Sequence, residues 1–228
     1  MPMKGGETDG YREIDRWDRG VGWIAYPGED MQRASHALVG DDGGVWVVDP
    51  VDAPGVDDLL AQFGDVVGVV VGLDRHKRDA AALATRHEVP VYLPNWMSGV
   101  ERELDAPVQR YDRELGDSGI EAIKLRDSSI PEWQEVGLVH RADGTLLVPE
   151  TLGTASFFRA PGESLGVHPV LRPVPPRRAL GGYDPERVLV GHGDGVMENA
   201  GAVLRETLDD ARRNMPGAYG RMIRELLP

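Results

Sequence analysis

Short apolar runs separated by turn-forming residues predict alternating strands and helices in the first half of the chain. Residues 45–49 are apolar on both faces as far as Val48, which is typical of a strand covered on both sides. Apolar residues then recur with helical spacing from Val56 to Phe63. The other elements predicted here are strands at 21–26, 35–40, 66–72 and 89–93 and a helix at 78–86.

The second half repeats this loose order of hairpin, strand and helix, which is consistent with an internal duplication in two layers. Residues 153–176 are rich in Gly and Pro and predict a loop with little regular structure. The predicted elements are strands at 119–125, 135–140, 145–148 and 188–190 and helices at 197–213 and 219–227. The pattern as a whole predicts an α/β fold.

Length and composition narrow the class of protein. A chain of 228 residues favours one domain, here 1–228, with a core large enough to need no covalent staple. The absence of cysteine excludes disulfides, thiolate metal sites and a cysteine nucleophile. There is no apolar run of membrane-spanning length and no apolar signal core at the N-terminus, so we expect a cytoplasmic protein.

The net charge of −13 points to habitat more than to a partner. Lysine occurs only at Lys4, Lys77 and Lys124, and aspartate outnumbers glutamate. An acidic, lysine-poor surface is typical of proteins from salt-loving archaea, where a Debye length of about 3 Å or less screens self-repulsion. Such a surface repels nucleic acid and anionic membranes, so we expect neither as a partner.

Candidate chemistry first appears where strand 66–72 ends. The following segment, 74–79, carries Asp74, His76 and Asp79 with basic residues between them. Side chains at i and i+2 of such a loop can converge beyond the sheet edge, where open α/β folds place their sites. The alternative is a solvated loop in which Asp74 caps the next helix.

Two later strand ends carry further candidates. Glu150 follows the apolar run 146–148, either as a carboxylate ligand or as a polar residue leaving the core. His192 lies between Gly191 and Gly193 after strand 188–190. The glycine-rich turn at 191–195 is interpreted as a ligand position, as a metal-free phosphate cradle of backbone N–H groups, or as a plain turn with a surface histidine.

The remaining polar residues give weaker signals. Asp49 either hydrogen-bonds a neighbouring loop or only ends its strand. The other four histidines have no partner spacing and are expected on the surface or as satisfied core residues; they are His36, His87, His140 and His168.

Taken in order, these segments resemble the metallo-β-lactamase fold superfamily from about residue 21 to 210. Val47-Val48-Asp49-Pro50 is similar to the family strand that ends in aspartate, and Val190-Gly191-His192-Gly193 is similar to its late Gly-His-Gly. The resemblance implies a four-layer αβ/βα sandwich and metal-dependent hydrolysis with an activated water as nucleophile.

The resemblance also implies which residues stand at the seven ligand positions of the family. His76 and His192 keep the family residue, whereas Arg78 stands where the His-x-His-x-Asp-His motif has aspartate. The third histidine of the first metal site would fall at Ser128 or Ser129. The implied metal ligands are Asp74, His76, Asp79, Glu150 and His192.

Arg78 decides what kind of site these residues can form. A guanidinium within about 5 Å of a second metal would repel it by several kcal/mol, so at most one ion is expected. The first hypothesis is a divergent, hydrolase-like protein that binds one Zn, Mn or Fe ion and a small-molecule substrate, with Asp79 as base. The alternative is a non-catalytic relative without metal, in which Arg78 pairs with Glu150, Asp74 or Asp79 and the cleft binds a small molecule or nothing. The apolar tail 219–227 could support a homodimer.

Overall fold

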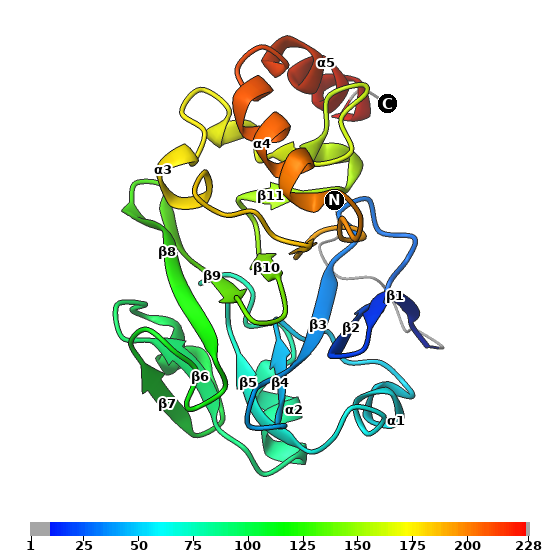
Figure 1. Cartoon of the computed structure of the whole chain (residues 1–228). Coiled ribbons are helices and arrows are strands. Elements are labelled where there is room, and N and C mark those ends of the chain that lie inside the picture. The colour runs from blue at the N-terminus through cyan, green and yellow to red at the C-terminus, as the bar shows by residue number, and fades with distance from the viewer. Residues whose placement is uncertain (1–9, 227–228) are drawn as a thin grey trace.

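Two β-sheets lie face to face with helices on their outer sides (Figure 1). The computed structural model describes residues 10–226. The larger sheet has the strand order β1 to β7. Neighbouring strands are antiparallel from β1 to β4 and parallel from β4 to β7. Its strands are β1 (Arg12–Trp17), β2 (Gly20–Ile24), β3 (Ala34–Val39), β4 (Val45–Val48), β5 (Val66–Val70), β6 (Val91–Pro94) and β7 (Val108–Tyr111).

The smaller sheet has the order β13-β10-β9-β8, with β10 and β13 parallel. β8 and β9 form a long antiparallel hairpin with a bulge between Lys124 and Arg126. The strands are β8 (Ile120–Ser129), β9 (Glu132–His140), β10 (Thr145–Val148) and β13 (Arg187–Val190), and a separate pair is formed by β11 (Leu152–Gly153) and β12 (Gly166–Val167).

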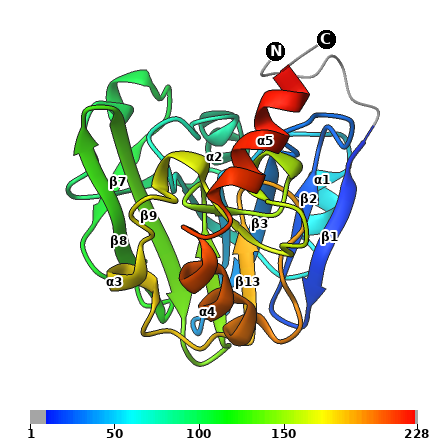
Figure 2. The same cartoon turned by 90° about the horizontal axis from the view of Figure 1, so that it is seen from above.

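Helices complete a helix–sheet–sheet–helix order, as expected for an αβ/βα sandwich. α2 packs on β5 and β6, while α4 lies along β13 on the far side (Figure 2). The helices are α1 (Val56–Leu60), α2 (Ala80–Arg86), α3 (Arg177–Leu180), α4 (Ala200–Asp210) and α5 (Met215–Leu226), with short 3-10 helices at Val100–Glu103, Ser156–Phe158 and Pro169–Leu171. No helix in the described part of the chain is both long and apolar enough to span a membrane.

The smaller sheet contributes to two cores because successive side chains of a strand face opposite sides. On β10, Leu147 packs in the core between the sheets, whereas Leu146 and Val148 pack in the core beneath α4. Leu204 and Leu208 of α4 close that second core. The apolar run that ends at Val148 therefore reflects a strand covered on both faces.

The sequence pattern missed two edge strands and displaced several helix ends. β1 is polar and buries only Ile14, so its pattern resembles a loop. β7 is a four-residue strand with little burial. α4 is shorter than its predicted 197–213, and α5 begins at Met215, before the predicted 219; Leu227 lies outside the described residues. The prediction of little regular structure at 153–176 is confirmed apart from β12, the end of β11 and two 3-10 turns.

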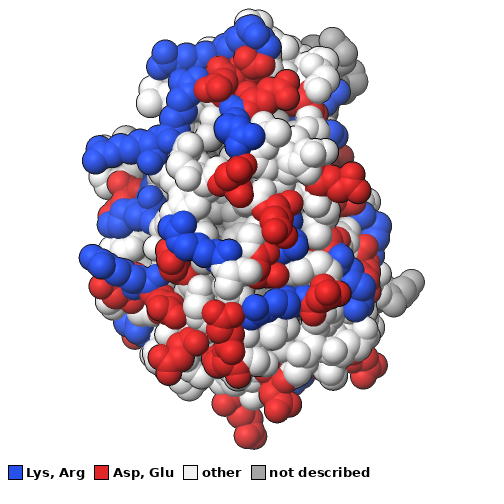
Figure 3. Space-filling model, in the orientation of Figure 1, with Lys and Arg blue, Asp and Glu red and all other residues white. Residues whose placement is uncertain are grey.

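The surface carries both signs of charge. Figure 3 shows Asp and Glu scattered over the visible face, many of them beside Lys or Arg. Basic side chains gather on the side where α3 and β8 lie.

Candidate metal centre

Three strand ends bring His76, Glu150 and His192 together. His76 lies in the turn after β5, Glu150 two residues after β10, and His192 two residues after β13. Because Val148 and Val190 are register partners in the parallel β10–β13 pair, Glu150 and His192 emerge side by side. The cluster therefore lies at the carboxyl ends of strands, where the sequence placed it.

The three side chains are buried and face one another at short range. His192 Nε2 lies 2.8 Å from Glu150 Oε2, and His76 Nε2 lies 3.3 Å from the same oxygen. The two Nε2 atoms are 3.4 Å apart. Each residue is less than a tenth exposed. In the described part of the chain, this is the group of histidines and carboxylates whose atoms could hold an ion.

The other ring nitrogens orient the two imidazoles. His192 Nδ1 lies 2.8 Å from the carbonyl oxygen of Met31, and His76 Nδ1 lies 2.9 Å from Asp49 Oδ2. Asp49 Oδ1 accepts the N–H of Gly72 at 2.7 Å, so Asp49 does bind the neighbouring loop. A carbonyl oxygen only accepts hydrogen bonds, and therefore His192 carries its proton on Nδ1.

This tautomer leaves a lone pair of His192 Nε2 aimed at the Glu150 carboxylate. Two acceptors at 2.8 Å repel one another unless a cation or an additional proton lies between them. A metal ion or an imidazolium would each resolve the contact. The centre of the cluster is thus built for a positive charge.

The separations test whether a metal fits. Ligand atoms around a tetrahedral ion with ~2.0–2.1 Å bonds lie ~3.3–3.4 Å apart. Two of the three separations, 3.3 and 3.4 Å, already have this value, and the third would need to open from 2.8 Å. Two imidazoles with one carboxylate form a donor set found in catalytic zinc sites. The residues therefore fit one divalent ion.

The pKa shifts keep Glu150 ionised and act in opposite directions on the two imidazoles. Burial raises the pKa of Glu150, but the interactions with His192 and His76 outweigh it and hold that pKa far below its usual value. Burial lowers the pKa of His192, in spite of Glu150. For His76, burial and the charge of Arg78 act downward, and Asp49 with Glu150 raises the pKa overall.

Arg78 lies beside the cluster and donates to main-chain carbonyls. Its Nη1 donates to Ala34 O and to Asp49 O, and its Nη2 donates to Gly191 O at 3.2 Å. Nη2 also lies 3.5 Å from His76 Nε2. Burial lowers its pKa to about 10, so it remains charged at neutral pH. The expected ion pairs of Arg78 with Glu150, Asp74 or Asp79 are replaced by these carbonyl contacts.

Asp74 and Asp79, both expected among the ligands, bind main-chain N–H groups outside the cluster. Asp74 Oδ2 accepts the N–H of Gln134 at 2.9 Å, and Asp79 Oδ2 accepts the N–H of Asp52 at 2.9 Å. Asp79, not Asp74, is the N-cap residue of α2. Both carboxylates hold loops in place and lie outside the cluster that could hold an ion, and their roles as ligands, with Asp79 as base, stay predictions.

His168, expected to be a surface or core residue, completes the wall of the cluster. Its Nδ1 accepts the N–H of Val170, and its Nε2 lies 3.6 Å from Glu150 Oε1. Burial lowers its pKa to about 4, and the charges of Arg75 and Arg126 act in the same direction. No spacing in the sequence signalled this residue, because the irregular segment 153–176 carries it there.

Two other predicted features lie outside the cluster. Ser128 and Ser129 end β8 at the tip of the hairpin, where Ser128 Oγ donates to Ile130 O. In the turn 191–195, the N–H of Gly195 binds the Asp15 carboxylate, and those of Gly193 and Gly191 bind Gln32 O and Val148 O. These three N–H groups are therefore not available to a phosphate, which weighs against a metal-free cradle in this turn.

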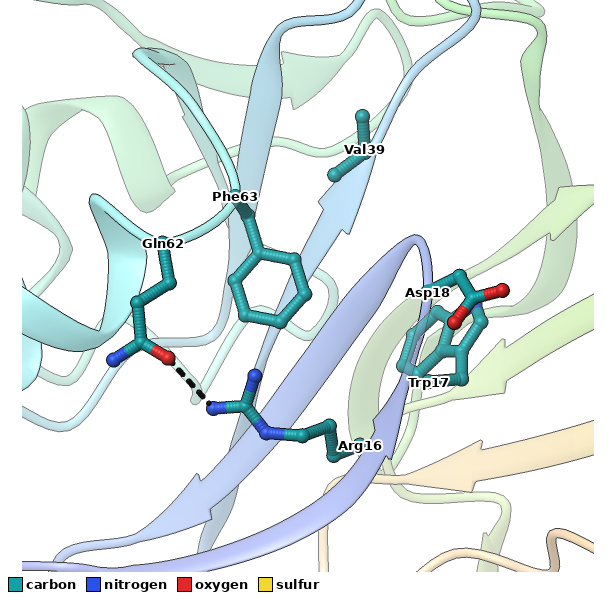
Figure 4. Close-up of a pocket in the computed structure, with 6 residues that line it drawn as sticks. All are labelled: Arg16, Trp17, Asp18, Val39, Gln62 and Phe63. Carbon is teal, nitrogen blue, oxygen red and sulfur yellow. Dashed lines mark hydrogen bonds between the residues drawn. The ribbon is translucent and has the colours of Figure 1, made fainter.

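An open surface depression of about 480 Å³ lies elsewhere, between β1 and α1 (Figure 4). Arg16 stacks over Phe63 at 5.1 Å and donates to Gln62 and Glu13. The polar groups that line the depression therefore bind one another, and its lining residues do not form a set of metal-binding side chains.

Comparison with known proteins supports the fold and leaves the chemistry open. No family model and no curated protein matches the chain. Among solved structures, the DIM-1 metallo-beta-lactamase exposed to ceftazidime matches with a TM-score of 0.61 at 14% identity, over 90% of this chain and 100% of that chain. VMB-1 at pH 5.5 matches with a TM-score of 0.61 at 11% identity, over 93% and 99% of the two chains.

A third match comes from a different kind of protein. A fragment (1–254) of a putative diflavin flavoprotein from Nostoc sp. PCC 7120 has a TM-score of 0.62 at 11% identity and covers 94% of this chain and 98% of that one. Identities this low establish architecture only. Together with the two facing sheets, they show that this chain has the metallo-β-lactamase fold.

Proposed function

We propose that this protein is a divergent, hydrolase-like member of the metallo-β-lactamase fold that binds one divalent metal ion through His76, Glu150 and His192. The observation that carries the proposal is the His192–Glu150 contact: a lone pair and a carboxylate 2.8 Å apart repel one another until a metal ion or a proton joins them. The donor set suits Zn and also accepts Mn or Fe. Such an ion, when bound, supplies Lewis acidity for hydrolysis.

The protein's own residues divide the other tasks of the proposed site. Asp49 and the Met31 carbonyl fix both imidazoles, which leaves Nε2 of each ring for the centre. His168, whose pKa is lowered to about 4, is neutral at pH 7 and directs its Nε2–H toward Glu150 Oε1. Arg78 supplies a fixed positive charge beside His76, where the resemblance placed a ligand of a second metal.

The alternative is a non-catalytic relative with an imidazolium in place of the metal. The short His192–Glu150 distance of 2.8 Å is also that of an ordinary charged hydrogen bond, which supports this alternative. The two candidates differ in whether a chelator changes the stability of the protein, since a bound metal at one hundred times its dissociation constant adds about 2.7 kcal/mol.

Elemental analysis of protein purified without a metal-affinity tag tests the proposal. We expect one equivalent of Zn, Mn or Fe in the wild type and almost none in His192→Ala or in the nearly isosteric Glu150→Gln. His87→Ala is the matched control, because His87 pairs with Asp57 on the surface. The alternative is established if the wild-type protein binds much less than one equivalent of metal after incubation with Zn, Mn or Fe, and if a chelator does not change its melting temperature.

A second prediction concerns Asp49→Asn. Asparagine tolerates the left-handed backbone of residue 49 (φ 48°) and can still accept the N–H of Gly72. It then presents an amide N–H to His76 Nδ1, which turns the ring or reverses its tautomer. We expect metal affinity to fall about 10- to 100-fold, measured by competition with a chromophoric chelator. An unchanged affinity in a folded variant would remove Asp49 from the site.

A further inference from the structure

Trp133 forms a platform one ring away from the proposed metal centre. It lies on β9 and is 3% exposed, and its Nε1 donates to Glu135 at 2.8 Å. The ring of His168 meets the indole edge-on with centroids 4.9 Å apart. Because His168 also approaches Glu150, only the ring of His168 separates Trp133 from the cluster.

Two guanidinium groups lie over this single indole. Arg75, from the turn after β5, lies 5.0 Å from the ring centroid, and Arg126, from β8, lies 5.2 Å from it. The bulge between Lys124 and Arg126 breaks the alternation of the strand. As a result Lys124 stacks over Trp96 while Arg126 reaches Trp133.

The two arginines differ in how their charge is satisfied. Arg75 donates to Glu132 O at 2.9 Å and makes a long contact of 3.3 Å with Asp74. Arg126 has its Nε buried without a hydrogen-bond partner, and among the described residues no carboxylate pairs with it. Two other cations that lie over aromatic rings do have such partners, since Lys124 pairs with Asp127 and Arg141 with Glu121.

Two guanidinium groups that approach one ring repel each other, and the cation–π contacts and the long Arg75–Asp74 contact offset only part of that cost. Two arginine forks are well suited to bind phosphate or carboxylate oxygens. The side of the molecule that carries β8 is also where basic side chains gather in Figure 3. In a chain of net charge −13, this local excess of positive charge is unusual.

From this geometry we infer that Arg75 and Arg126, stacked on Trp133, bind the anionic group, phosphate or carboxylate, of a small-molecule substrate. The inference rests on the proposed function of the adjoining cluster and specifies the class of substrate. Phe157, half-buried with its ring 5.5 Å from that of His168, adds an apolar wall beside the same ring. A small anion with an apolar body fits both surfaces.

Calorimetric titration with inorganic phosphate at fixed ionic strength tests this inference, with acetate as a second arm for the carboxylate class. We expect saturable binding to the wild type and a loss of tenfold or more in Arg126→Gln. Arg141→Gln is the matched control, because Arg141 also stacks on an aromatic ring, Tyr183, but has Glu121 as its partner. The Arg141→Gln variant should bind phosphate and acetate as tightly as the wild type does.

The His192→Ala variant separates this inference from the proposed metal site. It should still bind phosphate or acetate if the arginines are the receptor, whatever the metal content of the protein. The inference is overturned if neither anion binds the wild type, if Arg126→Gln and Arg141→Gln weaken binding equally, or if binding disappears in His192→Ala and survives in Arg126→Gln. Arg75→Gln gives a second variant should Arg126→Gln fail to fold.

Discussion

Replacement of Arg172 by alanine is expected to lower the free energy of unfolding by about 3–5 kcal/mol, because it removes one partner of a buried ion pair. The Arg172 side chain is fully buried, and both of its terminal nitrogens reach the Glu163 carboxylate, at 3.0 and 2.5 Å. It also donates to Phe158 O and Ala211 O. The alanine variant would leave the Glu163 carboxylate, with a side chain only 9% exposed, without its cation and with only the neutral N–H donors of Ala160 and Asn214.

Denaturant unfolding at pH 7 measures this effect, with Arg177→Ala as control. Arg177 pairs with Asp209 on the surface, where such pairs contribute about 0–1 kcal/mol. A double variant, Arg172→Met with Glu163→Gln, should recover part of the loss by removing both charges together. The prediction is contradicted if the free energy of unfolding of Arg172→Ala lies within about 1 kcal/mol of the wild-type value.

The same pair gives the protein an acid-sensitive contribution. Burial raises the pKa of Glu163, but Arg172 together with the N–H groups of Ala160 and Asn214 outweighs it and lowers that pKa below its usual value. A carboxyl group whose pKa is lower in the folded state stabilises the protein above its unfolded pKa, and this stability is lost as pH falls through the folded pKa. Glu163→Gln should therefore flatten the loss of stability below about pH 4.5.

This ion pair also supports the candidate site. Arg172 holds the carbonyl of Phe158, and the ring of Phe158 stacks on His192 with centroids 5.3 Å apart. The partly irregular segment 153–176 thus depends on one buried cation for its position. The Arg172 variant should accordingly lose metal affinity as well as stability.

The strand ends of the site could be predicted from the sequence, and the directions of the loop side chains could not. Val188–Val190 and the run ending at Val148 are apolar on both faces, so His192 and Glu150 had to emerge at a sheet edge. Asp74 and Asp79 share that edge, but their carboxylates bind the main-chain N–H groups of Gln134 and Asp52. These contacts join segments far apart in sequence.

Two further features depended on tertiary structure alone. Arg78 has a left-handed backbone (φ 39°), which lets its side chain reach the carbonyls of Ala34 and Gly191. No local pattern predicts that conformation for arginine. His168 reaches Glu150 through a segment without hydrophobic period, and β1 was missed because only Ile14 of that strand is buried.

Replacement of Arg78 by glutamine is expected to change metal affinity and stability in opposite directions. The guanidinium lies 3.5 Å from His76 Nε2, and a unit charge about 5 Å from a divalent ion opposes its binding by several kcal/mol at an effective dielectric near 20. We therefore expect affinity for Zn to rise about 10- to 100-fold, as measured by chelator competition.

The stability of the metal-free variant should fall, because the carbonyls of Ala34, Asp49 and Gly191 lose their charged donor. A hydrogen bond to a charged group contributes about 1.5–3 kcal/mol, and a glutamine amide can replace only some of these bonds. The loss is limited because Asp49 O and Gly191 O each keep a second donor, Ser35 Oγ and the N–H of Ala34. Lys77→Gln is the matched control: Lys77 lies in the same turn, and its Nζ pairs with the carboxylate of Glu103 on the surface. The Lys77→Gln variant should have nearly the same affinity for Zn and the same stability as the wild type. If Arg78→Gln loses stability without gaining affinity for Zn, Arg78 serves only to hold the loops in place.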